Sequence, residues 1–97
     1  MDVSLPDLNV LTVCDDANLR RLLREVLRSM NIGRLMQARD GRDALQLVKA
    51  ESAPHIVFCD WQLADMPGLD LAVQFRVEAP TTRFMIMSAS ADRKYVQ

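Results

Sequence analysis

The sequence predicts an α/β domain built on a doubly wound parallel sheet. Apolar strand segments alternate with helical segments along the chain, and such alternation gives parallel strands joined by right-handed helical crossovers. The apolar run at residues 56–59 fits a strand that is buried on both faces, and it ends directly in Asp60. Doubly wound sheets bind their ligands beyond the carboxyl ends of the strands, so we expect function at that edge.

The first strand is expected at residues 8–14, which are rich in β-branched and apolar side chains. Asn18 is a good N-cap for the helix that follows. Apolar residues recur in that helix with the spacing of one amphipathic stripe: Leu19, Leu22, Leu23, Val26, Leu27 and Met30. Gly33 is suited to the left-handed position that ends the helix.

The remainder of the chain continues the alternation. Further strands are expected at residues 34–38, 55–59 and 83–87, the first with the mixed polarity of an edge strand. Further helices are expected at residues 43–51, about 68–77 and 91–97. In the helix that begins near residue 68, we expect burial of some of Leu69, Ala72, Val73 and Phe75.

Composition narrows the class of protein. The 97 residues suit one domain, and 49% hydrophobic with 26% charged residues is typical of a globular protein. The net charge of −1 gives no reason to expect nucleic acid as a partner. No apolar run approaches the ~20 residues that span a bilayer, and the N-terminus lacks the features of a signal peptide. We therefore predict a cytoplasmic protein without a membrane or nucleic-acid partner.

The cysteines and the histidine are expected to be structural. Cys14 and Cys59 lie in or at the ends of apolar strand segments, so we predict buried free thiols. Two cysteines alone make a poor metal site, which argues against a metal pair. His55 lies at the start of a strand, away from the carboxyl ends, and is expected to be a surface or capping residue.

Polar residues follow three of the expected strands: Asp15 and Asp16, then Asp60, then Ser88. If these strands are neighbours, the four side chains share one edge of the sheet. Crowded carboxylates raise one another's pKa unless a cation is present, and Mg²⁺ prefers carboxylate oxygens, water and phosphate. A carboxylate can also attack phosphorus to give an aspartyl phosphate, which needs mainly positioning and charge neutralisation.

These motifs resemble the receiver domain of two-component response regulators. The resemblance runs from about Asn9 onward and rests on residues 10–16, 58–61 and 85–89, with Asp40-Gly41, Met66 and Gly68 also matching. It implies a flavodoxin-like receiver fold with strand order 2-1-3-4.

The resemblance also implies roles for individual residues. Asp60 would be the phosphoacceptor, with Ser88 as the switch hydroxyl. Asp16, Asp60 and the backbone carbonyl of Gln62 would bind Mg²⁺ directly, and Asp15 would act through a metal-bound water. The phosphodonor would be a histidine kinase or a histidine phosphotransfer protein, and the only catalysis would act on the chain itself.

The chain departs from the family pattern in three ways. Ala64 stands where the family usually has proline, and Pro67 where it usually has aspartate. We expect residues 1–97 to form a single truncated receiver domain that lacks the fifth strand and fifth helix. Neither Lys49 nor Lys94 matches the lysine that the family carries on its fifth strand. The expected fourth strand is apolar and lies at the edge of the sheet, and part of the first helix or the neighbouring sheet face would be left unshielded. These two features predict self-association.

Two other functions fit the sequence. A truncated or degenerate receiver could act as a protein-interaction or dimerisation module without a phosphorylation switch. A hydrolase that uses Asp60 on external substrates is less well supported, because nothing in the sequence forms a substrate pocket or a general acid beside the carboxylates.

Overall fold

The computed structural model describes residues 5–87 of the chain. A short 3₁₀ turn, Leu5–Asp7, precedes seven elements: β1 (Asn9–Val13), α1 (Ala17–Ser29), β2 (Arg34–Ala38), α2 (Gly41–Ala50), β3 (Ile56–Asp60), α3 (Gly68–Glu78) and β4 (Arg83–Met87). Ser88 and the helix expected at residues 91–97 lie outside the described residues.

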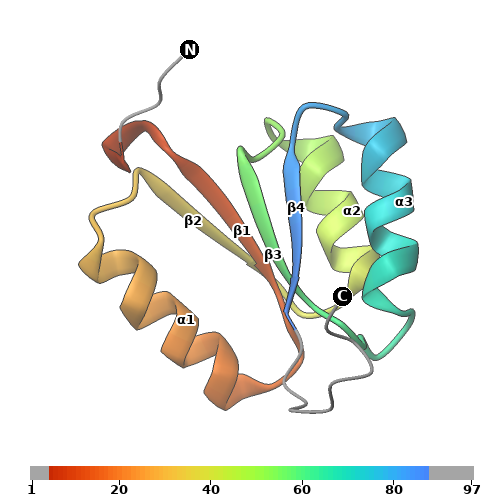
Figure 1. Ribbon diagram of the computed structural model, residues 1–97, viewed down its shortest axis with the longest axis horizontal. Coiled ribbons are helices and arrows are strands. Elements are labelled where there is room, and N and C mark those ends of the chain that lie inside the picture. The colour runs from red at the N-terminus through yellow and green to blue at the C-terminus, as the bar shows by residue number, and fades with distance from the viewer. Residues whose placement is uncertain (1–4, 88–97) are drawn as a thin grey trace.

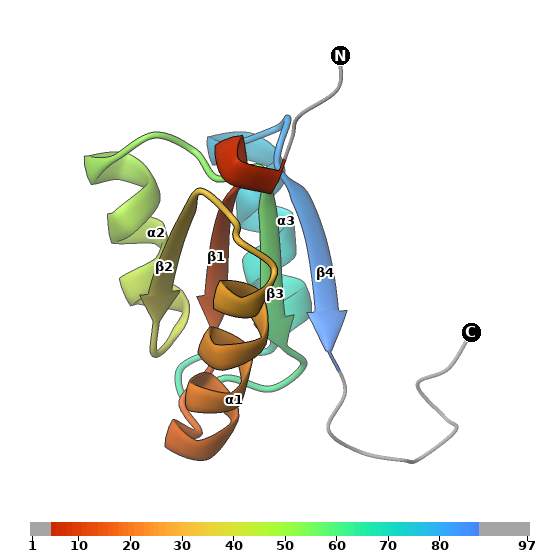
Figure 2. The ribbon, with the colours of Figure 1, turned by 90° about the vertical axis from the view of Figure 1, so that its left-hand side faces the viewer.

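The four strands form one parallel sheet in the order β2-β1-β3-β4, which confirms the predicted fold. Helix α1 lies on one face of the sheet, and α2 and α3 lie together on the other (Figure 1). Figure 2 shows α1 in front of the sheet, with the other two helices behind it. All four strands therefore present their carboxyl ends at the same edge, which we call the rim.

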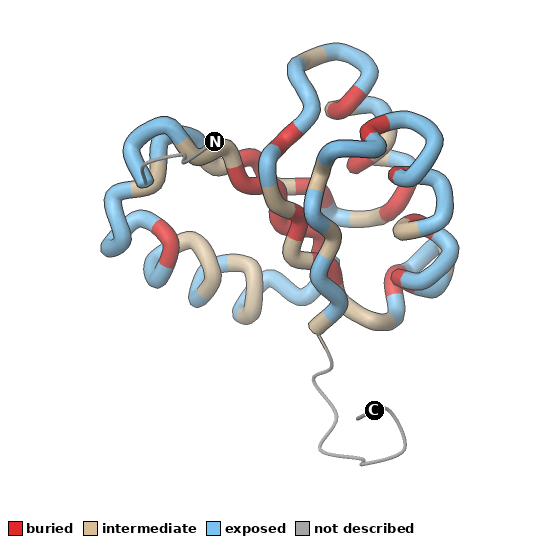
Figure 3. The backbone as a smooth tube through the Cα atoms, turned by 45° about the horizontal axis from the view of Figure 1, so that its top comes forward, coloured by how far each residue is buried: buried red, intermediate tan, exposed pale blue. Residues whose placement is uncertain are grey.

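The main core lies between the sheet and the helix pair α2 and α3. Leu11 and Val57 from the central strands are fully buried there, together with Leu71 and Phe75 from α3. The rings of Phe75 and Phe84 are 5.2 Å apart between centroids, so β4 is anchored to α3 by an aromatic contact. Figure 3 shows buried residues along the inner strands of the sheet and on the inner side of this helix pair.

The opposite face of the sheet is less completely covered. Of the six stripe residues predicted for α1, only Leu27 is buried, whereas Leu22, Val26 and Met30 are 46–55% exposed. Met85 of the edge strand β4 is 53% exposed. Because Phe84 faces α3, strand alternation points Met85 to the α1 side of the sheet. We call these four exposed residues the open-face patch.

The ends of α1 differ from the sequence expectation. Asp16, not Asn18, is the N-cap, and its side chain accepts hydrogen bonds from the first turn. At the other end Asn31 takes the left-handed conformation, with φ of 58°, and Gly33 does not. Gly33 is instead required for close approach, because a Cβ there would overlap the carbonyl oxygen of Pro6.

Helix α3 buries one row of its apolar side chains. Leu71 and Phe75 are buried as its inner row, and Leu69 and Val73 are 67% and 65% exposed. We expected some of Leu69, Ala72, Val73 and Phe75 to be buried, and of these Phe75 is buried whereas Leu69 and Val73 are exposed. The helix is apolar on most of its sides, so its periodicity did not select one face. Within residues 5–87, no helix is long and apolar enough to cross a membrane.

Candidate functional site

The rim brings Asp15 and Asp60 together, as the sequence predicted. Val13, the last residue of β1, is in register with Cys59, so Asp60 and the residues after Val13 leave the sheet at the same level. One ligand atom each from Cys14, Asp15 and Asp60 lies within 4.8 Å of the other two. Asp15 is exposed, Asp60 is half-buried and Cys14 is buried. This cluster is therefore accessible from the side of its two carboxylates.

Asp16 is used for a different purpose. Its Oδ1 accepts hydrogen bonds from the backbone N–H groups of Asn18, at 2.8 Å, and Leu19, at 3.3 Å. These groups have no partner within the helix, so the carboxylate acts as the N-cap of α1. We expected Asp16 to contact the ion directly and Asp15 to act through water. Among the described residues it is Asp15 that joins Asp60.

Cys14 is the member of the cluster that sequence reasoning missed. It was assigned to the strand, but β1 ends at Val13, and the thiol of the first residue beyond the strand reaches the carboxylates. Burial raises the pKa of the Cys14 thiol, and the negative charge of Asp60 acts in the same direction. The prediction of buried free thiols is confirmed for both cysteines. Burial also raises the pKa of Cys59, to about 12.

The loop after Asp60 is closed by backbone hydrogen bonds. The N–H of Trp61 donates to the carbonyl of Met87 at 2.9 Å, and the N–H of Gly68 donates to the carbonyl of Trp61 at 2.8 Å. Gln62 and Pro67 form an isolated antiparallel bridge across the loop. A Cβ at Gly68 would lie 2.5 Å from the backbone oxygen of Asp60, so a glycine is needed at this crossing.

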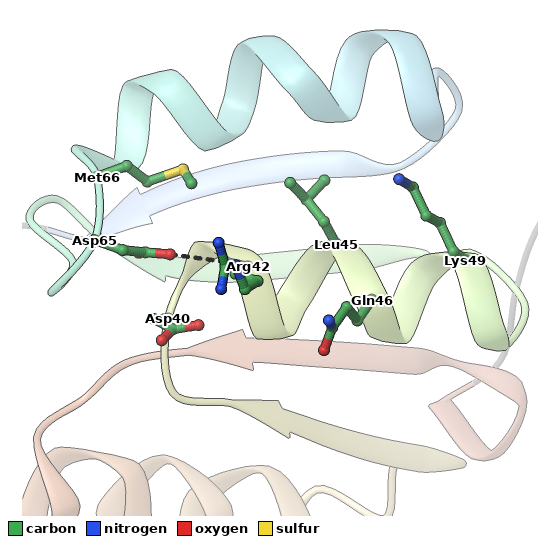
Figure 4. Close-up of a pocket in the computed structure, with 7 residues that line it drawn as sticks. All are labelled: Asp40, Arg42, Leu45, Gln46, Lys49, Asp65 and Met66. Atoms are coloured by element: carbon green, nitrogen blue, oxygen red, sulfur yellow. Dashed lines mark hydrogen bonds between the residues drawn. The ribbon is translucent and has the colours of Figure 1, made fainter.

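Asp65 fastens the same loop to α2. Its two carboxylate oxygens accept hydrogen bonds from the N–H groups of Gly41 and Arg42, each at 2.9 Å. Figure 4 shows the bond between Asp65 and Arg42. Desolvation raises the pKa of Asp65, but the backbone hydrogen bonds that it accepts and the positive charge of Arg42 together outweigh it and leave the pKa below its ordinary value. Asp65, in the loop after Asp60, therefore helps to cap the N-terminus of α2.

A hollow of about 650 Å³ lies beside Asp65, between the loop and α2, where Arg42, Lys49 and Met66 contribute to its lining. None of the three cluster residues lines it. His55 is remote from the cluster as well, since its Nδ1 accepts a hydrogen bond from the N–H of Asn9, at the start of β1. The expectation of a surface or capping histidine is confirmed.

The donor set of the cluster fits a divalent cation in part. Two carboxylates at the carboxyl ends of neighbouring strands are ligands of the kind that Mg²⁺ takes, with water completing its shell. The third group, the Cys14 thiol, is a soft donor of the kind that Mg²⁺ does not select. Asp15 and Asp60 would bind the ion, and the Cys14 thiol would lie beside them.

Comparison with known sequences gives a consistent result. The family described as the response regulator receiver domain matches residues 10–97. Chemotaxis protein CheY-3 of Vibrio cholerae is 26% identical over 91 residues, which cover 94% of this chain and 69% of that protein. A protein-glutamate methylesterase/protein-glutamine glutaminase of Methanococcus maripaludis is 31% identical over 84 residues, covering 86% of this chain and 23% of that protein.

Solved structures share the fold. The response regulator TrrA of Thermotoga maritima, solved in complex with Mg²⁺-BeF, superimposes with a TM-score of 0.79 at 23% identity. The match covers 91% of this chain and 75% of that one. The MaeR response regulator bound to beryllium trifluoride gives a TM-score of 0.78 at 23% identity, covering 92% of this chain and 73% of that one.

Proposed function

The chain belongs to the response regulator receiver family, and we propose that it accepts a phosphoryl group on Asp60 with Mg²⁺ as cofactor. One observation carries the proposal: the carboxylates of Asp15 and Asp60 converge at the carboxyl ends of the two central strands. This is the position at which open parallel sheets place their chemistry. The half-buried Asp60 can still be reached from solvent by a phosphodonor.

The chemistry needs only one covalent exchange. A carboxylate oxygen of Asp60 attacks phosphorus, the bond from phosphorus to the donor atom breaks, and the donor group leaves with the bonding electrons. The bound cation would neutralise the equatorial oxygens during transfer. Asp15 would hold that cation beside Asp60, so that the negative charge of the two carboxylates does not repel the incoming phosphoryl group.

The metal ligands proposed here follow the geometry of the rim. Asp15 and Asp60 would be the direct carboxylate ligands, and the backbone carbonyl of Gln62 is proposed as a further oxygen ligand from the resemblance. Asp16 would have to give up its hydrogen bonds to α1 before it could reach an ion. We therefore assign Asp16 to the helix and Asp15 to the metal.

The remaining roles follow from the family. The proposed phosphodonor is a histidine kinase or a histidine phosphotransfer protein, and the proposed location is the cytoplasm. Ser88 stays a prediction as the switch hydroxyl because it lies outside the described residues. Met87, the residue before it, is in register with Asp60, which supports the assignment. The extent of the domain, residues 1–97, also stays a prediction.

The proposal is tested by phosphorylation with a small acyl phosphate in the presence of Mg²⁺. Intact mass should increase by one phosphoryl group, and the emission of Trp61, next to Asp60, should change with the same time course. Asp60→Ala should abolish both signals. Glu78→Gln, at the far end of α3, removes an exposed carboxylate away from the rim and should leave both intact. A folded protein that gains no mass with any donor would contradict the proposal.

The second candidate function is an interaction module, and the open-face patch favours it. Leu22, Val26 and Met30 form an exposed apolar row along α1, and Met85 lies on the same side of the sheet in the edge strand β4. Exposed apolar surface together with an unpaired strand edge promotes association. We propose that the chain associates with itself through this surface.

Sedimentation or light scattering tests the association. The unmodified chain should be larger than a monomer, and Val26→Lys combined with Met85→Lys should shift it towards the monomer. Val73→Lys combined with Val77→Lys introduces the same two charges on the exposed side of α3 and should leave the assembly unchanged. A stable monomer that binds no hydrophobic dye would contradict self-association.

A further inference from the structure

The hollow beside Asp65 has a lining that the proposed function does not use. Its volume of about 650 Å³ lies within the range typical of ligand sites. Figure 4 shows Arg42 and Lys49 at opposite ends of its lining on α2, with Leu45 between them. Two cations around an apolar side chain are a distinctive arrangement, and the chemistry of a suitable occupant can be derived from it.

The two cations of the hollow are available to an external anion. Arg42 and Lys49 are both exposed. Among residues 5–87 the only ion pair joins Arg34 to Glu51, so neither cation has a carboxylate partner in this part of the chain. An anion that binds here therefore displaces no existing ion pair.

The two carboxylates of the hollow are engaged by the start of α2. Both oxygens of Asp65 accept hydrogen bonds from the first N–H groups of this helix, and Oδ1 of Asp40 accepts one from the N–H of Asp43 at 2.8 Å. Arg42 lowers the pKa of Asp65 through its charge but forms no ion pair with it. Because the helix start carries a partial positive charge, it offsets part of the charge of both acids. The charge left over is positive, so the occupant should be anionic.

The middle of the hollow is apolar. Leu45 and Met66 are half-buried and pack against the main core. A methionine side chain is flexible and polarisable, which suits a surface that receives the apolar side chain of a partner. A small inorganic anion would leave this apolar surface uncovered, so the occupant should carry an apolar group between its negative charges.

The spacing of the row selects the kind of occupant. Arg42, Leu45 and Lys49 follow one another at i, i+3 and i+7 on α2, and the ends of this row are about 10 Å apart along the helix axis. A second helix has the same period, so acidic residues at i and i+7 on it would meet both cations. We propose that the hollow is a docking site for an acidic amphipathic helix of a partner protein, whose apolar side chain covers Leu45.

The docking site is tested with a synthetic helical peptide that carries glutamates at i and i+7 and leucines at i+3 and i+4. A control peptide has the same composition, but its glutamates are two positions apart and therefore lie on opposite faces of the helix. Circular dichroism first shows that both peptides are helical. Titration of the first peptide into the isotope-labelled full chain should shift the amide resonances of residues 40–49 and 65–66 and reach saturation. The control peptide should bind at least about threefold more weakly, because it can form only one of the two ion pairs.

Paired variants separate this site from general attraction to basic surfaces. Arg42→Gln combined with Lys49→Gln should weaken binding of the first peptide by about three- to tenfold, as expected for the loss of two exposed ion pairs. Arg21→Gln combined with Arg28→Gln removes two exposed cations with the same i, i+7 spacing on α1 and should leave the affinity unchanged. Each variant is first shown to unfold cooperatively.

Three results would overturn the docking site: equal binding of the control peptide, an equal loss of affinity from the changes on α1, or resonance shifts confined to other elements. Sebacate, a linear dicarboxylate of similar length, is titrated in parallel. If it binds as tightly as the peptide, the hollow takes small organic anions and the partner-helix proposal is overturned. Asp60→Ala should bind the peptide normally, so this test stands or falls separately from the proposed phosphoacceptor function.

Discussion

The face of the sheet that packs against α2 and α3 excludes solvent from its apolar side chains, whereas the face beneath α1 leaves much of its apolar surface exposed. Leu71 and Phe75 on the closed face are at most 2% exposed, but Leu22 and Val26 of α1 are 55% and 48% exposed. Stability therefore comes mainly from the closed face. The apolar side chains of α1 on the open face remain exposed, and the candidate site lies at the rim between the two faces.

The largest expected effect comes from the centre of the closed face. Phe75→Ala removes a buried ring that packs against Phe84 and should lower the free energy of unfolding by about 3–5 kcal/mol. Urea denaturation followed by circular dichroism measures the change. Phe75→Leu, which keeps part of the apolar contact, should lose less. A loss below about 1 kcal/mol for Phe75→Ala would show that the closed face is not the main source of stability.

The next effect concerns the loop that joins the closed face to the rim. Gly68→Ala places a methyl group 2.5 Å from the backbone oxygen of Asp60, so the loop or the strand must shift. We expect a loss of about 1–3 kcal/mol in unfolding free energy, typical of overpacking. Metal affinity should fall as well, because Asp60 is displaced. Ala72→Gly, also in α3, is a control for helix propensity that should leave metal affinity unchanged.

A smaller effect is expected at Asp65. Asp65→Ala leaves the N–H groups of Gly41 and Arg42 without their acceptor and should cost about 1 kcal/mol at neutral pH, as the loss of a helix cap does. The folded-state pKa of Asp65 is lowered from 3.8, so its contribution is present above pH 3.8 and is lost as pH falls through the folded pKa. Stabilities of both proteins, measured across this acid range, should therefore converge. A difference that persisted at the lowest pH would rule out the carboxylate as the cause.

The smallest effect on stability is expected on the open face. Val26→Thr and Met85→Thr remove exposed apolar atoms and should each change the unfolding free energy by less than about 0.5 kcal/mol at low protein concentration. Binding of a hydrophobic dye should decrease nonetheless. A loss comparable to that of Phe75→Ala would mean that this face is buried in the native assembly.

The parallel strands and the presence of helices were predictable from local patterns, whereas the strand order came from the family resemblance. β2 and β4 occupy the residues expected for them, because period and composition mark their ends. The start of α2 was placed two residues late at Asp43, whereas the helix begins at Gly41. Part of the reason is non-local, since Asp65 caps its first N–H groups from a loop far along the chain.

The approach of Asp15 to Asp60 was predictable from the sequence, while the roles of the site residues stay predictions. Asp60 and Asp15 followed from the rule that strands of a parallel sheet end at one edge. The assignment of Asp16 to the metal came from the family resemblance, whereas in the structure β1 ends at Val13, Cys14 and Asp15 lie at the rim, and Asp16 caps α1. A one-residue shift in a strand end changes which side chain faces a site, and composition alone does not fix that end.

All three strand pairs of the sheet are parallel, and this arrangement has a consequence for how the chain folds. Parallel neighbours cannot form a local hairpin. Pairing β1 with β3 therefore closes the long chain segment that contains α1, β2 and α2. Asp15 and Asp60 come from the ends of these two strands and cannot share an ion before the strands pair. In a refolding experiment, metal binding should therefore report the completion of the central strand pair. An ion bound there stabilises only chains that have passed this step.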